Sequence, residues 1–382
     1  CCGFAGLVLL GGLVLYLPFY VGFRSQASGF GMVDYVKTPW LQYALIFGLF
    51  LSVLLPWLLG LILKESRRPR LAGTYAAALA VVLVLPLGLL LLGGEGGAPA
   101  VAMAFLSQGP WLALALGVLV AMAAALLLCR LADPTQGAAG TWALLLTAAG
   151  LLLTFGTEFV FVRDSFGTRM NTVFKFYYQA WTLLGVAAAI AVAEVIRRYR
   201  LSKSPLLGLW LGGVSLLLLA ALYYPLAAAA SKAGFFAGQP NLDGTAWLDP
   251  ASGEGAAIAW LAAHAGDDAV ILEAPGDEYN ASHNRVSGWT GIPTVLGWAG
   301  HEGQWRGSYD EVARRQPDIE NLYTSQQPAQ ITVLLNKYDI DYVYVGPYEV
   351  QKYALGPADL RALDRVLQRV YDRDGVVIYA RR

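Results

Sequence analysis

Long apolar runs separated by short polar segments dominate the first 231 residues of the chain. A helix that crosses a membrane needs about 20 consecutive, mostly apolar residues. Seven runs reach or approach that length, and we expect each of them to be a span. They lie at residues 3–23, 41–63, 72–93, 110–129, 141–162, 173–196 and 205–230. The end of the fifth run is the hardest to place, because it merges into a polar segment.

The pattern changes after residue 231. Gly and Pro residues in 232–253 predict a linker, and short apolar strands then alternate with helical patterns. Helices are expected at 254–265, 309–322, 327–337 and 357–369, and strands at 269–274, 293–296, 341–346 and 375–380. Residues 254–382 therefore predict a small α/β domain in which helices pack on an open sheet.

Composition agrees with a membrane protein, since 57% of the 382 residues are hydrophobic and only 14% are charged. The net charge of zero hides two unlike parts. Residues 1–231 hold 14 Lys and Arg against 7 Asp and Glu, a net of +7, and the remaining 13 and 20 give residues 232–382 a net of −7. The basic excess lies in loops between spans, where membrane topology explains it, so we expect no nucleic-acid binding.

Loop charge also predicts the orientation. Three alternate loops hold Lys64, Arg67, Arg68, Arg70, Arg130, Arg197, Arg198, Arg200 and Lys203. The opposite side holds Arg24, Lys37, Arg163 and Arg169. Because basic loops stay in the cytoplasm, the C-terminal domain should be extracytoplasmic. The chain opens on Cys1 inside an apolar run without signal-peptide features, and we expect further membrane helices upstream.

The segment Glu158 to Lys175 carries the densest charge beside a span. It reads EFVFVRDSFGTRMNTVFK, and we expect a loop. Ionisable groups beside hydrocarbon are costly and predict a functional site. The candidates are Glu158, Arg163, Asp164, Arg169, Asn171, Lys175 and, in the following span, Tyr178.

Two interpretations of this segment remain open. In the functional one, Arg163, Arg169 and Lys175 hold a phosphate or pyrophosphate, and Glu158 or Asp164 acts as a base or positions a divalent metal ion. In the structural one, the charges pair with one another and the aromatic side chains form an interfacial belt.

A second candidate segment, Arg285 to Arg306, reads RVSGWTGIPTVLGWAGHEGQWR. Its tryptophans and polar side chains suit sugar binding, because pyranose rings stack on indole. The candidate ligand-contacting residues are Arg285, His301, Glu302, Gln304, Trp305 and Arg306. The alternative is that Trp289 and Trp298 are buried core.

Other motifs give weaker signals. His301-Glu302 lacks the second histidine of the zinc-protease pattern HExxH, although His301 could bind a metal together with His283. Asn280-Ala281-Ser282 fits an N-glycosylation acceptor. No Walker or GxGxxG motif is present.

These stretches resemble the C-terminal portion of the YYY-type membrane proteins, an uncharacterised archaeal and bacterial family grouped with GT-C glycosyltransferase-like proteins. The matching segments are LPFY (17–20), RDSFGTRMNTVFKFYYQAW (163–181), LDGTAWL (242–248), RVSGWTGIPTVLGWAGHEGQWR (285–306) and DYVYVGPYE (341–349). The resemblance implies a GT-C-like architecture with a multi-span core and an external C-terminal domain.

Membership of the wider group implies glycosyl transfer from a polyprenyl-phosphate-linked sugar at the outer face, to a glycan or protein acceptor. The chain departs from the family in lacking its Tyr-rich N-terminal motif. In GT-C enzymes the catalytic carboxylate usually lies in the first external loop, which we expect upstream of Cys1. In that case Glu158 or Asp164 would be supporting residues.

Three hypotheses follow. The first is a membrane glycosyltransferase-like protein that uses a lipid-linked sugar. The second is a non-enzymatic envelope-assembly protein that binds a glycan or a partner, and a lipid-sized groove beside the sixth span would favour the enzyme over it. A transporter ranks third, because the charged residues lie at span ends and no internal repeat is visible.

Overall fold

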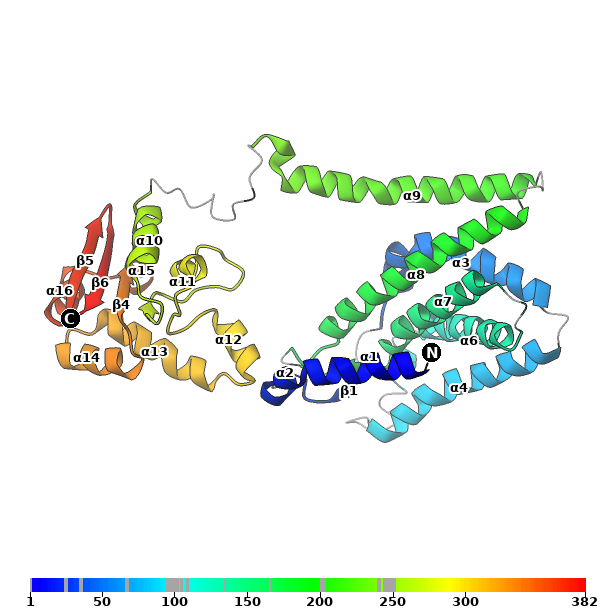
Figure 1. Ribbon diagram of the computed structural model, residues 1–382, viewed down its shortest axis with the longest axis horizontal. Coiled ribbons are helices and arrows are strands. Elements are labelled where there is room, and N and C mark those ends of the chain that lie inside the picture. Colours follow the sequence, from blue (N-terminus) through cyan, green and yellow to red (C-terminus); the bar gives the residue numbers. More distant parts are fainter. Residues whose placement is uncertain are drawn as a thin grey trace. The chain divides into compact units, whose positions relative to one another are not determined.

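The computed structural model describes residues 2–23, 27–33, 37–65, 69–93, 103, 106–107, 110–133, 135, 137–164, 166–199, 204–238, 242 and 252–382 (Figure 1). Most of the predicted linker 232–253, most of the loop after residue 93, and the LDGTAWL segment beyond Leu242 lie outside these residues. So do the basic residues Arg24, Arg67, Arg68, Arg200 and Lys203.

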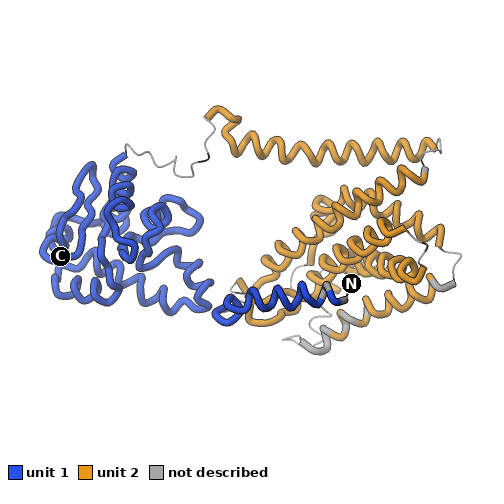
Figure 2. The backbone as a smooth tube through the Cα atoms, in the orientation of Figure 1, with its two compact units in different colours: residues 1–26, 239–382 blue, residues 27–238 orange. Residues whose placement is uncertain are grey.

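The chain forms two compact units (Figure 2). One unit, which we call the membrane unit, is Ala27–Gly238. The other comprises Cys1–Gln26 and Gln239–Arg382, and we call its second segment the C-terminal unit. The two candidate segments therefore belong to different units.

Five described helices are long and apolar enough to cross a membrane: α3 (Trp40–Glu65), α6 (Trp111–Leu131), α7 (Ala138–Gly156), α8 (Met170–Tyr199) and α9 (Pro205–Lys232). The first and third predicted spans coincide with α1 (Cys2–Leu15), α2 (Leu17–Gly22) and α4 (Pro69–Gly93). Within these two predicted spans, the apolar helical stretches that the structure describes are shorter than the five helices above, at Gly6–Leu15 and Leu71–Val82. A mostly helical protein with several membrane helices is thus confirmed.

The core of the membrane unit forms where α7 packs between α6 and α8. Small side chains on the buried face of α7, at Gly140, Ala143, Thr147 and Gly150, let its backbone approach its neighbours closely. Helix α3 packs on the same bundle against α8, with Phe47, Leu54 and Leu58 buried. Helix α9 has no buried residues and contacts α3, where Trp210 Nε1 donates to the carbonyl of Ser52 at 3.0 Å.

The fifth predicted span, 141–162, ends too late. Helix α7 stops at Gly156, and Val160–Val162 forms strand β2, which pairs antiparallel with β1 (Phe30–Met32). The β-branched valines alternate with Phe161 and suit a strand. The predicted loop 158–175 is also too long, because α8 begins at Met170 and places Asn171 and Lys175 in its first turns.

The C-terminal unit holds a four-stranded sheet in the order β3-β4-β6-β5. Strands β3 (Ile271–Leu272) and β4 (Tyr342–Val345) are parallel, while β6 (Val376–Arg381) runs antiparallel to β4 and to β5 (Leu367–Arg373). The helices are α10 (Gly253–His264), α11 (Arg285–Thr290), α12 (Ala299–Arg306), α13 (Asp310–Thr324), α14 (Pro328–Lys337), α15 (Pro347–Tyr353) and α16 (Pro357–Val366). A short 3-10 turn, η1 (Gly234–Phe236), follows α9.

Most elements predicted here are confirmed, with two exceptions. The strand expected at 293–296 is an isolated bridge between Thr294 and Ile271. The helix expected at 357–369 ends at Val366, where the chain enters β5. Gly291, in a left-handed conformation with φ of 76°, ends α11 just before this bridge.

Close packing of α7 on α8 gives a first prediction. A Cβ on Gly150 would lie 2.8 Å from Leu184 Cγ and 3.4 Å from the carbonyl of Ala180, so Gly150→Val should destabilise the protein by about 1–3 kcal/mol. Gly156→Val is the matched control, because nothing lies within 4 Å of a Cβ at that end of α7. Thermal unfolding in detergent measures both, and equal melting temperatures for the two variants would contradict the packing.

Candidate functional site

A short two-stranded ribbon positions the polar segment of the membrane unit. Beyond the β1–β2 pairing, Ser28 N donates to the carbonyl of Arg163 and Val33 N to that of Phe159, each at 2.9 Å. A side chain on Gly31 would overlap the Phe161 ring, so a glycine is needed where the strands meet. The ribbon brings the chain before α3 against the chain between α7 and α8.

Glu158 lies at the centre of this junction, with only 1% of its surface exposed. Its carboxylate accepts from Thr38 N at 3.1 Å, from Thr38 Oγ1 at 2.5 Å and from Arg169 Nη1 at 3.0 Å. Arg169 also donates to the carbonyl of Thr157 and to Thr38 Oγ1, at 3.0 and 3.1 Å. The chain before α3 and the chain between α7 and α8 therefore meet at one buried carboxylate, and we call Thr38, Glu158 and Arg169 the clamp.

Lys37 adds a second cation beside the clamp. It is 7% exposed, and its Nζ donates to the carbonyls of Val33 and Glu158 at 2.9 and 2.6 Å. The same Nζ lies 5.6 Å from the centre of the Phe159 ring. Lys37, Glu158 and Arg169 together carry two positive charges and one negative charge.

A groove of about 910 Å³ opens at the clamp, between the starts of α3 and α8. Its polar end is formed by Lys37, Thr38, Thr168 and Arg169. Its remaining wall consists of Pro39, Gln42, Ile46, Met170, Val173, Phe174, Tyr177, Tyr178 and Trp181. Trp181 lies about 16 Å along α8 from Met170, so the groove follows the helix into the apolar part of the unit.

The structure places the predicted residues of this segment in different surroundings. Arg169 and Tyr178 line the groove, and Glu158 lies behind Arg169. Asp164 accepts from Asn171 Nδ2 at 2.7 Å and from Phe166 N at 3.0 Å, so it holds the turn before α8. The other two cations, Arg163 and Lys175, are not among the residues that line the groove.

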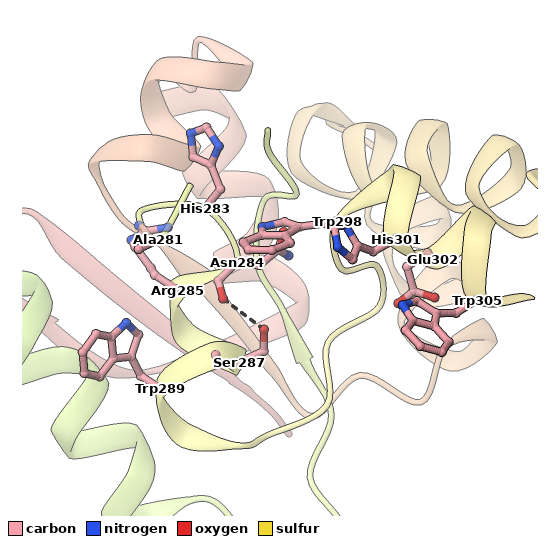
Figure 3. A pocket seen from close by; sticks show the side chains of 11 residues that line it. Ala281, His283, Asn284, Arg285, Ser287, Trp289, Trp298, His301, Glu302 and Trp305 are labelled. Atoms are coloured by element: carbon pink, nitrogen blue, oxygen red, sulfur yellow. Dashed lines mark hydrogen bonds between the residues drawn. The ribbon is translucent and has the colours of Figure 1, made fainter. Parts of the chain in front are cut away.

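The second predicted segment surrounds a pocket of about 600 Å³ in the C-terminal unit, which we call the tryptophan pocket (Figure 3). Helices α11 and α12 and the loop between them supply its wall, with Trp289 and Trp305 on opposite sides of the view. His301, Glu302 and Trp305, three of the residues predicted to contact a ligand, line it from α12. Gln304 and Arg306 are on the same helix but are not lining residues.

Arg285 lines the pocket but is 3% exposed and held between two carboxylates. It pairs with Glu254, and its Nη2 lies 3.0 Å from Glu349 Oε2. Burial lowers the pKa of the guanidinium, but the two carboxylates outweigh burial and raise it, so Arg285 stays charged. Its observed contacts make it a support beneath the pocket.

His301 is held by a neighbouring carboxylate, since its Nδ1 lies 3.3 Å from Glu278 Oε2. Its ring also packs against Trp298 and Tyr279, with ring centres 5.3 and 4.9 Å apart. Among the described residues, no group of three or more His, Cys, Asp or Glu side chains could hold a metal ion. A metal bound by His301 and His283 therefore stays a prediction without a third ligand.

Sequence reasoning missed Lys37, Thr38 and Asn284 as site residues. Lys37 and Thr38 directly precede a predicted span, and a lysine at the less basic side of the membrane was the available signal. Asn284 gave no comparable signal, because its position depends on a left-handed backbone conformation (φ 52°, ψ 38°) before α11.

Removal of the hydroxyl at the centre of the clamp gives a second prediction. Thr38→Val should destabilise the protein by about 2–3 kcal/mol, because the hydroxyl bonds to two charged groups. Thr141→Val is the control, since Thr141 Oγ1 donates one exposed bond to the carbonyl of Gly137, just before α7. Thermal unfolding in detergent measures the difference, and a Thr38→Val protein as stable as the control would show that the clamp contributes little.

The support beneath the tryptophan pocket gives a third. Glu349 is fully buried, and its negative charge balances part of the charge environment of Arg285. Glu349→Gln removes that negative charge beside a buried guanidinium, so it should destabilise the C-terminal unit by about 3–5 kcal/mol. Glu302→Gln, whose carboxylate is partly exposed and paired with exposed Arg306, should cost less than about 1 kcal/mol. Chemical denaturation followed by circular dichroism compares the two, and equal losses would refute the assigned roles.

Comparison with known proteins agrees with a multi-pass membrane protein. No curated protein matches the chain. Residues 2–184 match the model of a family described as an uncharacterized membrane protein (DUF2298), and the chain is similar to that family over this range, which includes both sides of the groove.

Proposed function

We propose that the groove beside α8 binds the phosphate of a polyprenyl-phosphate-linked sugar and the first part of its lipid tail. The protein is then a GT-C-like membrane glycosyltransferase that works at the outer face. The observation that carries this proposal is the make-up of the groove, which starts at two cations and continues along apolar and aromatic side chains.

The size and polarity of the groove fit such a lipid. Its volume of about 910 Å³ is at the upper end of the range usual for small-molecule sites. Phe174 and Trp181 are 61% and 52% exposed, so their apolar surface is available to a lipid tail. A sugar headgroup would extend from the polar end, away from the helices.

The charges at the polar end also suit a phosphate. Two cations, Lys37 and Arg169, line this end, where a phosphate could accept hydrogen bonds from them. Thr168 adds a hydroxyl at the same end. Because Arg169 is held by the clamp, its guanidinium is fixed before the lipid arrives, and preorganised cations stabilise charge that grows on a leaving phosphate.

The roles of the carboxylates follow from their contacts. Glu158 is buried and accepts from Thr38 and Arg169, so in this proposal it positions Arg169 and does not take a proton from the acceptor. Asp164 is half-buried and bonded to Asn171, which also suits a supporting role. The base, and any divalent metal ion that it positions, would then come from elsewhere, as the resemblance to GT-C enzymes implies.

We also propose an orientation of the protein in the membrane. The groove and the candidate segment 158–175 are at one end of α3 and α8, and the basic residues Lys64, Arg197 and Arg198 are at the other. Helix α8 has 30 residues, which corresponds to about 45 Å, so its two ends can lie on opposite sides of a bilayer. The basic end is assigned to the cytoplasm, which puts the groove and the C-terminal unit on the outer face.

A second candidate function is a non-enzymatic protein of envelope assembly that binds a glycan. The tryptophan pocket favours it, because aromatic walls and polar side chains suit carbohydrate without requiring transfer. The two functions differ in what happens to a bound donor. A transferase releases polyprenyl phosphate with time when an acceptor is present, whereas a binding protein returns the lipid-linked sugar intact.

Occlusion of the groove tests the lipid site. Ile46 lines the groove and is 46% exposed, so Ile46→Trp should fill the groove without disturbing the core. Native mass spectrometry of the full chain with added decaprenyl phosphate should show bound lipid for the wild type and roughly tenfold less for Ile46→Trp, a difference of about 1.4 kcal/mol.

Leu59→Trp is the matched control, because Leu59 is on the same helix, is 55% exposed and lies outside the groove. It should bind as the wild type does. Decaprenol, which has the tail but no phosphate, should bind more weakly. Equal occupancy of Ile46→Trp and Leu59→Trp, or equal binding of both lipids, would reject the groove as a phosphate-headed lipid site.

A further inference from the structure

Three buried polar atoms of residues that line the tryptophan pocket have no hydrogen-bond partner in the described part of the chain. One of them, His301 Nδ1, faces Glu278 Oε2 at 3.3 Å. The other two are Oδ1 of Asn284 and Nε1 of Trp298. Buried polar atoms are almost always hydrogen-bonded, and leaving one without a partner costs about 1–3 kcal/mol. Both residues line the pocket, so the two atoms are candidates for ligand contacts (Figure 3).

The backbone and side chain of Asn284 are fixed by other contacts. Its Nδ2 donates to the carbonyl of Leu296 at 2.9 Å, which orients the amide and leaves Oδ1 as the acceptor. Its own carbonyl accepts from Gly288 N at 3.0 Å and Ser287 Oγ at 3.2 Å, at the start of α11. Only 9% of Asn284 is exposed. The acceptor is therefore held in place before a ligand binds.

The same pocket offers aromatic surface on more than one side. Trp298 packs against His301 within the pocket, while Trp305, at the right of the view in Figure 3, is 68% exposed. The face of an indole ring carries partial negative charge and attracts the C–H groups on one face of a sugar ring. Hydroxyl groups both donate and accept, so they match Asn284 Oδ1 and Trp298 Nε1 together.

We propose that the tryptophan pocket is a binding site for a neutral pyranose, with Trp298 and Trp305 as stacking surfaces and Asn284 and Trp298 as the polar contacts. The pocket volume of about 600 Å³ is within the range of small-molecule sites. The proposal shifts the sugar contacts from Arg285, Gln304 and Arg306 to Asn284 and Trp298, each of which has a buried polar atom without a partner in the described part of the chain.

Charge disfavours an anionic ligand. The guanidinium of Arg285 is already matched by Glu254 and Glu349. Glu302 adds a carboxylate to the lining, and Glu278 stands beside His301. Among the described residues that line this pocket, the one arginine is therefore matched by carboxylates. Phosphates and acidic sugars are therefore poor ligands for this pocket.

The inference does not depend on the proposed lipid site. The pocket and the groove belong to different units, and each is formed by residues of its own unit. A sugar-binding pocket is compatible with a transferase as well as with a binding protein. Failure of one proposal therefore leaves the other intact.

Saturation-transfer-difference NMR on the full chain, in a detergent without a sugar headgroup, tests the pocket. The probes are the methyl glycosides of glucose, mannose, galactose and N-acetylglucosamine. Sorbitol is the control ligand, because it has the hydroxyl groups but no ring face. At least one glycoside should receive saturation at its ring C–H protons well above the level of sorbitol.

Two variants assign the contacts. Trp298→Phe keeps an aromatic ring and removes the donor, so the Kd should rise roughly 2- to 10-fold. Trp305→Ala removes an exposed stacking surface and should raise the Kd by a similar factor, roughly 2- to 10-fold. Trp142→Ala is the control, since Trp142 is 56% exposed and lies on α7 in the membrane unit. Melting curves establish that each variant is folded.

The proposal is overturned if no glycoside exceeds sorbitol, or if the glycoside that binds keeps its wild-type Kd in both pocket variants. A proline-rich decapeptide that binds the wild type and is lost in Trp305→Ala, while no glycoside binds, would instead assign the pocket to a peptide. These results do not depend on lipid binding, because decaprenyl phosphate is absent from the experiment.

Discussion

A buried carboxylate at a helix boundary holds the candidate site of the membrane unit together. Glu158 accepts from the chain before α3 and from Arg169 just before α8, and so fixes both walls of the groove. An ion pair in apolar surroundings is costly unless its remaining polar groups are satisfied. Here Thr38 and the carbonyl of Thr157 provide those contacts. The same interaction that closes the junction therefore orients a cation toward the groove.

The two pockets differ in a way that follows from this electrostatic arrangement. In the membrane unit, Arg169 pairs with the Glu158 carboxylate, Lys37 donates to the Glu158 carbonyl, and both cations line a largely apolar groove. In the C-terminal unit, one arginine is shared by two carboxylates, and the pocket above it is aromatic and without surplus positive charge. The first suits a phosphate attached to a lipid, and the second suits a neutral polar ring.

Sequence periodicity predicted most helices, because apolar runs and amphipathic spacing are local properties. The strand β5 was missed, since Leu367–Arg373 continues the spacing of the preceding helix and is a strand only through its pairing with β6. The end of α7 was misplaced because the apolar residues of β2 extend the hydrophobic run. Candidate residues were found by charge, but Thr38 meets Glu158 only in the fold, across 120 positions of the sequence.

The most direct test of the central claim is a density map of the full-length protein in native lipid. The density to inspect lies beside Lys37 and Arg169, along α3 and α8. The account predicts a phosphate-headed lipid whose head lies against Arg169 and whose tail passes Phe174 and Trp181. A groove filled by protein, or occupied by a lipid with its headgroup at the other end of α8, would contradict it.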